Sequence, residues 1–279
     1  MSRGRLYRTE AIVLRRTDFG EADRLLTLYT PGLGKIRAIA KGVRKPTSRK
    51  SGHVELFTHS QLLIAKGREL DIVTQAETLH AFRPLREDLR RITYAYYAVE
   101  LVDKFTKEGV ENRPLFDLLL AMLTRLGEAA DLDLTTRFFE LRLLDYVGYR
   151  PQLFRCVGCN ARIEPTTNFF GLSEGGVLCP RCGEERRHRE GRARREVGPI
   201  SLNALKVLRY LQTRDYALCR RLRISPESHG ELERIMRRYI TYLLERRLKS
   251  VEFLDTLRRE DDEKTTAIQE RGRDPRVLG

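Results

Sequence analysis

The stretch AIVLRRTDFGEADRLLTLYTPGLGKIRAIAKG, residues 11–42, decides the fold class of the N-terminal part of the chain. It contains three short apolar and β-branched runs, separated by the turn-forming segments DFGEAD and PGLGK. Two further runs follow, in HVELFTHSQLLIAKG and RELDIVTQAETLHAF, with a turn at Lys66-Gly67-Arg68 between them. Five short strands in about 75 residues favour a small closed barrel, because closure leaves no exposed sheet edge.

From Pro84 onward the apolar residues recur every three or four positions, which indicates helices. Helices are expected in LREDLRRITYAYYAVELVDKFTKEG, in RPLFDLLLAMLTRLGEA and in DLTTRFFELRLLDYVGY, where Asp133 suits an N-cap. After an interruption at Cys156 the pattern resumes past Pro199 and ends in one long helix over residues 226–254. The apolar stripe of the first helix is expected to consist of Leu85, Leu89, Ile92, Tyr96, Val99, Val102 and Phe105.

These patterns predict an α+β multidomain chain, with a barrel first and a helical domain after it. The predicted boundaries are 1–82 for the barrel, 83–155 for the first part of the helical domain, 156–198 for an inserted module that contains four cysteines and 199–257 for the second helical part. Residues 258–279 are mostly charged and polar, so we expect them to form a disordered tail.

The charge balance points to a polyanionic partner. The chain has 279 residues, a formal net charge of +14 and a pI of about 9.8. Soluble chains this basic usually bind nucleic acid or an anionic membrane, and the alternative is a protein that is merely basic. No stretch reaches the ~18 apolar residues of a membrane span, and the N-terminus has no small-residue cleavage site, so we expect a cytoplasmic protein.

Two CxxC pairs, Cys156-Val-Gly-Cys159 and Cys179-Pro-Arg-Cys182, are separated by 19 residues. Two residues between thiolates let both sulfur atoms of a pair reach one ion, and two such pairs complete a tetrahedral zinc site. A redox pair or a disulfide is the alternative, which a cytoplasmic location disfavours. Four thiolates leave no open coordination position, so one structural Zn²⁺ is expected. Cys219 lies far away on a helical stretch and is expected to be a buried thiol.

The densest run of positive charge is AKGVRKPTSRKSGH, residues 40–53, which contains no acidic residue. Gly42, Pro46 and Gly52 predict a loop that stays mobile, although a merely soluble loop is the alternative. On a small barrel, such a loop can form part of an electrostatic track for a phosphate backbone. The candidate nucleic-acid-binding residues are Arg15, Arg16, Arg24, Lys35, Arg37, Lys41, Arg44, Lys45, Arg49 and Lys50.

Three aromatic residues near this track could stack on bases. Tyr29 and Phe57 lie within strand patterns and are expected in the core, whereas Phe19 lies on a turn and is expected to be exposed.

The sequence carries no convincing catalytic motif. Gly32-Leu33-Gly34-Lys35 lacks the spacing of a phosphate-binding loop and the Ser or Thr that should follow the lysine, so we interpret it as a hairpin turn. The segment ERRHREGRARRE mixes arginines with glutamates, and a solvated linker is as good an interpretation of it as a phosphate contact. A binding function is therefore favoured over catalysis.

Two long stretches resemble a known family. AIVLRRTDFGEADRLLTLYTPGLGKIRAIAKGVRKPTSRKSG, followed by ELFTHSQLLIAKGRELDIVTQAE, is similar to the N-terminal domain of the bacterial RecO family. VGYRPQLFRCVGC, with the later LCPRCG, is similar to the zinc-containing version of that family. Asn160 departs from the glycine that commonly follows the second cysteine, but Asn tolerates the left-handed conformation that this position requires.

The resemblance implies an OB-fold, then a helical domain with an inserted zinc module. It implies binding of single- and double-stranded DNA, annealing of complementary strands and a partnership with RecR, with RecF as a further candidate partner. It also implies contact with the acidic, apolar tail of the single-strand-DNA-binding protein, so that RecA can be loaded during repair. The implied location is cytoplasmic and nucleoid-associated. The rival class is an RNA-binding or translation-associated factor, since OB-folds and zinc ribbons serve there too.

Overall fold

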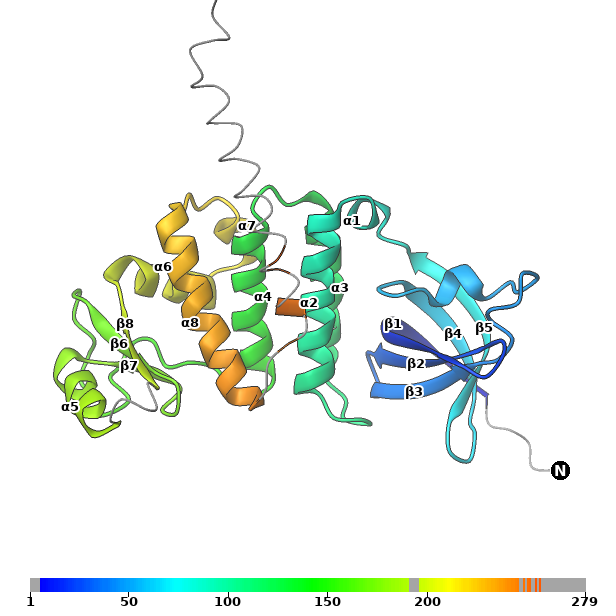
Figure 1. Ribbon diagram of the computed structural model, residues 1–279, viewed down its shortest axis with the longest axis horizontal. Helices are drawn as coiled ribbons and strands as arrows, with labels where there is room; N and C mark the ends of the chain where they lie inside the picture. Colours follow the sequence, from blue (N-terminus) through cyan, green and yellow to red (C-terminus); the bar gives the residue numbers. More distant parts are fainter. Residues whose placement is uncertain are drawn as a thin grey trace, which may run out of the picture.

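The N-terminal part of the chain is a five-stranded closed barrel (Figure 1). The computed structural model describes residues 6–190 and 196–245, together with residues 248, 250, 251, 254 and 256. The barrel strands are β1 (Leu6–Phe19), β2 (Asp23–Thr30), β3 (Gly34–Ala40), β4 (His59–Ala65) and β5 (Asp71–His80). They close in the order β1-β2-β3-β5-β4, with a parallel contact between β3 and β5 and antiparallel pairing elsewhere. This is the predicted OB-fold.

Alternate residues of β1 serve two different cores. Ala11 and Val13 point into the barrel, where they pack with Leu28 and other interior side chains. Ile12 and Leu14 point outward and join the large apolar cluster of the helical domain. The barrel therefore buries an outer face as well as its interior, and that outer face fixes the helices against it.

The turn between β2 and β3 confirms the interpretation of GLGK as a hairpin, and it also touches the helical domain. Gly34 has a φ of +63°, and a Cβ at this position would lie 2.0 Å from the backbone oxygen of Val110. The backbone N–H of Gly109 donates to the carbonyl of Lys35 over 2.9 Å. Only glycine fits at residue 34, because both the left-handed conformation and the close approach exclude a side chain.

The strand predicted over residues 53–67 is shorter in the structure. A short 3₁₀ helix, η1 (Ser51–Val54), precedes β4, which begins at His59. Phe57 is buried as predicted, but it lies in a turn with a φ of +68°, and its N–H donates to the carbonyl of Val13. This turn directs the aromatic ring to the outer face of the barrel, where its centroid lies 5.0 Å from that of Tyr96.

The first predicted helix is divided in two. Glu87 is the C-cap of α1 (Arg83–Arg86), and Asp88 is the N-cap of α2 (Leu89–Phe105), where its carboxylate accepts from the N–H groups of Arg90 and Arg91. The predicted apolar stripe is partly wrong: Leu89 is 60% exposed and Tyr96 45% exposed. The helix contacts the barrel on one side and other helices on the other, so its buried face is broader than a single stripe.

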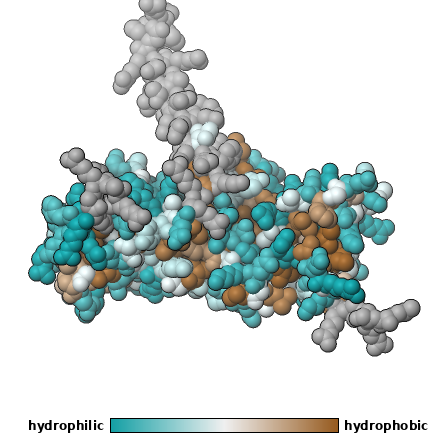
Figure 2. Space-filling model, turned by 60° about the horizontal axis from the view of Figure 1, so that its bottom comes forward, coloured by the Kyte–Doolittle hydropathy of each residue, from teal (hydrophilic) through white to brown (hydrophobic). Residues whose placement is uncertain are grey.

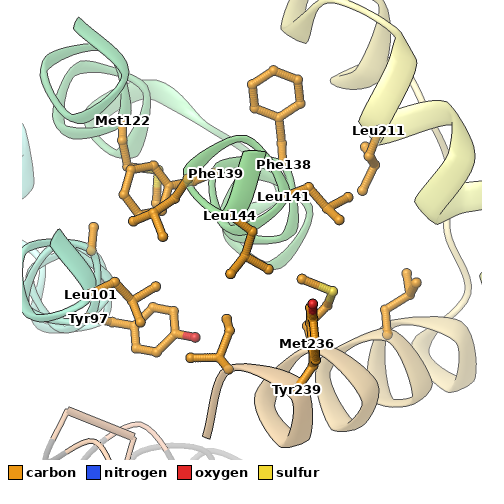
Figure 3. Packing of buried hydrophobic residues seen from close by; sticks show 14 of the residues in the cluster. Tyr97, Leu101, Met122, Phe138, Phe139, Leu141, Leu144, Leu211, Met236 and Tyr239 are labelled. Atoms are coloured by element: carbon orange, nitrogen blue, oxygen red, sulfur yellow. The ribbon is translucent and has the colours of Figure 1, made fainter. Parts of the chain in front are cut away.

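Two further helices continue the helical domain, α3 (Arg113–Glu128) and α4 (Leu132–Tyr146). The N-cap of α4 is Asp131, whose side chain accepts from the N–H of Leu134, and the predicted cap Asp133 lies instead in the first turn. Side chains from α2, α3, α6 and α8 converge on α4 (Figure 3). Figure 3 shows Tyr97 and Leu101 from α2, Met122 from α3, Leu211 from α6 and Met236 from α8 around it.

A small sheet follows, which we call the cysteine module (residues 152–200). It contains β6 (Asn168–Gly171), β7 (Gly176–Leu178), α5 (Pro180–Glu190) and β8 (Val197–Ile200), with strand order β7-β6-β8. The sequence patterns predict neither α5 nor β8, since residues 185–196 are interpreted as a solvated linker or a phosphate contact. The helix predicted past Pro199 begins only after β8, at Leu202. The structure of α5 and β8 depends on pairing and packing with β6, which is distant in sequence. Arg192, Arg194 and Arg195 lie outside the described residues.

The chain returns to the helical domain through α6 (Leu202–Thr213), α7 (Tyr216–Cys219) and α8 (Pro226–Leu244). The single long helix predicted over residues 226–254 is wrong, because Glu245 adopts a left-handed φ of +53° and ends α8. The predicted disordered tail, residues 258–279, lies outside the described residues. Within the described part of the chain, no helix is long and apolar enough to cross a membrane.

Candidate metal centre and nucleic-acid interface

The four predicted metal ligands come together at one end of the cysteine module. The sulfur atoms of Cys156, Cys159, Cys179 and Cys182 all lie within 4.8 Å of one another. The Sγ atoms of Cys159 and Cys179 are 3.9 Å apart. Thiolates around a tetrahedral zinc are roughly 3.8 Å apart for Zn–S bonds of about 2.3 Å, whereas a disulfide bond measures about 2.05 Å. The spacing fits a metal and excludes a Cys159–Cys179 disulfide.

The electrostatics of this cluster favour a bound cation. Burial raises the pKa of Cys156, but backbone N–H groups of Cys179, Cys159 and Gly158 outweigh burial and lower it to about 6. The N–H of Cys179 lies 3.3 Å from that sulfur. Burial and the neighbouring cysteines raise the pKa of Cys182 to about 12. A fourth thiolate among three others therefore needs a positive ion, and a Cys₄ donor set suits zinc.

The backbone of the first CxxC pair is shaped for this geometry. A Cβ on Gly158 would lie 3.2 Å from both the Cβ and the Sγ of Cys182, so the tight contact favours glycine there. Asn160 adopts a φ of +59°, and its N–H donates to the carbonyl of Cys156 over 2.8 Å. The expectation that Asn would tolerate the left-handed conformation is confirmed. Cys219 is a buried free thiol, as predicted.

The structure separates the ten candidate nucleic-acid-binding residues into groups with different surroundings. Lys35 is nearly buried and faces α2, where its Nζ lies 3.0 Å from Oδ1 of Asp103 and 2.5 Å from the backbone oxygen of the same residue. It joins the barrel to the helical domain.

A second group is held in an ion-pair network on the barrel. Arg24 donates to Asp18 and to Glu55, at 3.1 and 2.9 Å. Arg16 also pairs with Glu55, and Arg44 lies 3.4 Å from Asp18. Glu55 follows the basic loop (residues 40–53) in the sequence. The charge pattern of the loop alone therefore did not reveal that Glu55 pairs with Arg16 and Arg24.

The basic loop is anchored rather than free. Val43 is fully buried in the barrel core, and the N–H of Arg44 donates to the carbonyl of Ala22. Lys50 turns inward, where its Nζ donates to the backbone oxygens of Lys41 and Val73, and desolvation lowers its pKa. The loop predicted to be mobile is therefore attached to the barrel at two places, Val43–Arg44 and Lys50.

Four candidate cations remain exposed and, among the described residues, form no ion pair: Arg15, Lys41, Lys45 and Arg49. Arg37 is exposed as well, 3.9 Å from a carboxylate oxygen of Glu108. Arg15 and Arg37 flank Thr27 in one row across three strands, since Arg15 pairs with Thr27 and Thr27 with Arg37. This row borders a polar cavity of about 450 Å³ that Lys104 of α2 also lines.

The aromatic predictions are confirmed in their burial. Phe19 is 51% exposed at the end of β1, and Tyr29 and Phe57 are buried. Sequence reasoning assigned Tyr96 to the core, but its ring borders a second cavity of about 620 Å³, together with Arg15 and Arg16. The deviation follows from the position of α2 against the barrel, which helical periodicity alone does not show.

Comparison with known proteins decides the family. The family model described as Recombination protein O N terminal matches residues 1–82, and the model described as Recombination protein O C terminal matches residues 86–252. The chain belongs to the RecO family. The candidate cations lie in the first matched range and the four cysteines in the second, which confirms the resemblance read from the sequence.

RecO relatives cover nearly the whole chain. The DNA repair protein RecO of Roseiflexus sp. (strain RS-1) is 49% identical over 256 residues, which are 92% of this chain and 87% of the relative. The DNA repair proteins RecO of Dehalococcoides mccartyi (strain ATCC BAA-2266 / KCTC 15142 / 195) and Pelotomaculum thermopropionicum (strain DSM 13744 / JCM 10971 / SI) are 40% and 42% identical. Those matches cover 91% and 90% of this chain and 96% and 94% of the relatives.

Proposed function

We propose that this RecO family member acts by binding rather than by catalysis: it anneals complementary DNA strands and, with RecR, helps to load RecA onto single strands coated by the single-strand-DNA-binding protein. The observation that carries the DNA-binding part is the set of exposed barrel cations that form no ion pair with any residue the structure describes, Arg15, Lys41, Lys45 and Arg49. Such side chains neutralise phosphate without selecting a sequence, as an annealing protein requires.

The division between paired and unpaired cations refines this proposal. Lys35 and Lys50 hold the barrel and its loop in place through backbone and carboxylate oxygens. Arg16, Arg24 and Arg44 share two carboxylates, so their charge is already offset. The unpaired residues, with Arg37 at the edge of the row, form the part of the track that phosphate would contact first.

We also propose that the four cysteines hold one Zn²⁺ with a structural role. The donor set fills all four positions of a tetrahedral ion, so it leaves none for a substrate. The ion would join the CxxC loop at residues 156–159 to the start of α5, because Cys179 and Cys182 flank that helix start.

A pocket on the helical domain suits the predicted tail of the single-strand-DNA-binding protein. A cavity of about 710 Å³ is lined by the aromatic residues Phe138, Tyr146 and Tyr216. Its charged lining residues are three arginines, Arg125, Arg142 and Arg220, and two acids, Asp117 and Asp215, so positive charge is in excess. The Cζ of Arg125 lies 4.0 Å from the ring centroid of Tyr216, and that of Arg142 lies 5.2 Å from the centroid of Phe138. The combination of aromatic walls and positive charge suits a peptide with an acidic stretch and a terminal aromatic residue.

Titration of a fluorescent tail peptide into the full chain tests this pocket. Changing Arg142 and Arg220 to Gln should weaken binding by roughly fivefold for each lost contact, at about 1 kcal/mol apiece. R90Q/R234Q is the matched control, because both arginines are exposed, on α2 and α8, and neither lines the cavity. If the control and the double variant lose affinity equally, the pocket is not the docking site.

An equilibrium competition between single-stranded DNA and RNA of one sequence separates the proposed function from its rival. We expect DNA to compete at least as well as RNA, with strong weakening by salt for both. A clear preference for RNA would support the translation-associated class instead.

A further inference from the structure

An exposed phenylalanine on the cysteine module, away from the barrel, has one arginine against its ring and two further arginines nearby, one next to it in the chain and one close to the first arginine. We call Phe154, Arg155, Arg162 and Arg209 the arginine–phenylalanine cluster. Phe154 is 42% exposed, and the Cζ of Arg209 lies 5.1 Å from its ring centroid. The Nε of Arg209 donates to the backbone oxygen of Leu153 over 2.8 Å, which holds the guanidinium beside the ring.

The backbone sets Arg155 and Arg162 side by side. They form an antiparallel bridge, flanked by hydrogen bonds from Ile163 to Phe154 at 3.3 Å and from Cys156 to Ala161 at 2.8 Å. The flanking bonds make Arg155 and Arg162 a non-hydrogen-bonded pair, in which the side chains share one face and the Cα atoms are only about 4.5 Å apart. Two like charges are therefore fixed opposite one another, an arrangement that destabilises a bridge unless an anion offsets it.

Within the described part of the chain, no carboxylate pairs with these arginines. Arg155 donates only to the backbone oxygen of Asn160, at 3.2 Å. The nearest acid in sequence, Glu164, is exposed, and among the described residues it forms no ion pair with any of the three. Desolvation and then the charge of Arg162 lower the pKa of Arg209, so these two arginines are close enough to repel each other.

We propose that the arginine–phenylalanine cluster is a second contact site for a nucleic-acid backbone, separate from the barrel. The cysteine module and the barrel lie at opposite ends of the long axis, with the helices between them (Figure 1). A chain with both sites contacts two nucleic-acid segments at once. This inference rests on the proposed annealing function. Annealing brings two polyanionic strands together, and the cluster would bind the second of these strands.

The chemistry of the cluster favours nucleic acid over an acidic protein. Guanidinium groups bind phosphate oxygens through paired N–H donors. An exposed aromatic ring beside a guanidinium plane offers a stacking surface for an unpaired base, which an acidic peptide does not need. In the view of Figure 2, the end with the cysteine module is mostly hydrophilic, and hydrophobic residues gather over the helices and part of the barrel.

Photo-crosslinking tests the site directly. Single-stranded DNA that carries 5-iodouracil is irradiated with the full chain, and the crosslinked peptides are identified by mass spectrometry. We expect one crosslinked peptide from the barrel and a second that contains Phe154. In R155Q/R162Q the second should fall at least fivefold, while the barrel crosslink stays. The control R90Q/R234Q removes the same charge from exposed positions on α2 and α8 and should leave both crosslinks unchanged.

The outcomes separate this inference from the proposed function. Equal crosslinking at Phe154 in R155Q/R162Q and in the wild type, or none in either, overturns the second site even if the wild type anneals strands. Competition of the Phe154 crosslink by poly-glutamate as effectively as by unlabelled DNA would assign the cluster to an acidic protein instead. R155Q/R162Q should keep the zinc content of the wild type and a thermal midpoint at least as high, because the substitutions remove a repulsion, and this excludes misfolding as the cause of a lost crosslink.

Discussion

The ammonium group of Lys35, on β3, donates to both the side-chain and the backbone oxygen of Asp103, on α2. The contact lies beside the hairpin that places Gly34 against Val110, so two adjacent residues connect the barrel to the helical domain. Sequence patterns alone suggested a nucleic-acid contact for Lys35. The structure gives it a partner that phosphate would have to displace.

Replacing Lys35 with Met should therefore reduce stability more than DNA affinity. The substitution keeps the apolar stem but leaves the oxygens of Asp103 without their donor, which should lower the free energy of unfolding by about 1–3 kcal/mol. Urea denaturation measures this loss. Arg37→Met, two residues along the same strand and exposed, should instead weaken DNA binding with little change in stability. The reverse pattern would return Lys35 to the nucleic-acid track.

The features that depend on residues close together in the sequence were predicted correctly. Most of the features that were missed depend on contacts between residues far apart in the sequence. The β2–β3 hairpin, the CxxC pairs and the left-handed Asn160 depend on residues that are close in sequence. The pairing of Arg24 with Glu55, the anchoring of the basic loop by Val43 and the strand β8 depend on residues brought together only by the fold. No glycine or proline lies near Glu245 in the sequence to indicate that α8 ends there.

Domain boundaries remain a prediction. The predicted boundary at 198/199 falls inside β8 (Val197–Ile200), which pairs with β6 of the cysteine module. The family models place a division between residues 82 and 86, close to the predicted end of the barrel at residue 82.

Removal of the metal should unfold the cysteine module. We expect one zinc per chain in protein purified under reducing conditions, and Cys156→Ser or Cys182→Ser should lose it and lower the thermal midpoint. DNA affinity of the folded fraction should fall less than stability, since the barrel track lies elsewhere. Cys219→Ser should keep the full zinc content, because Cys219 is outside the cluster. Metal-free wild-type protein with an unchanged thermal midpoint would contradict a structural zinc site.

The contact between His229 and Asp131 should make stability depend on pH. The Nε2 of His229 lies 3.2 Å from a carboxylate oxygen of Asp131, the N-cap of α4. Hydrogen bonding to Asp131 raises the pKa of His229. A raised histidine pKa stabilises the fold below the unfolded-state pKa, near 6.5, and the contribution disappears as pH rises through the folded-state pKa.

His229→Gln should therefore cost more stability in acid than in base. We expect a difference of roughly 0.3–1 kcal/mol between about pH 5.5 and about pH 8, because the pair is partly exposed. Chemical denaturation of both proteins at the two pH values gives this difference. Buried His59, whose pKa is lowered by burial, has the opposite pH dependence, but it is present in both proteins and cancels. An equal cost at both pH values would show that the ion pair contributes nothing.

The exposed loop cations should carry salt-dependent DNA affinity, and the inward-facing Lys50 should not. Changing Lys41, Lys45 and Arg49 to Ala should reduce the slope of log affinity against log salt by about 0.7 per residue on single strands. Lys50→Ala removes one of the same charges but should act mainly on stability, because its Nζ bonds the backbone of Lys41 and Val73. Fluorescence anisotropy over a range of salt concentrations measures both. An unchanged slope in the triple variant would place the track elsewhere.

Strand annealing is the most direct test of the central claim. Complementary oligonucleotides are coated with the single-strand-DNA-binding protein, and duplex formation is followed by fluorescence transfer with and without the full chain. The account predicts that the wild type anneals the coated strands, that the triple variant of Lys41, Lys45 and Arg49 is slower, and that Lys50→Ala matches the wild type once its stability is allowed for. Coated strands that stay single at saturating wild-type protein would contradict it.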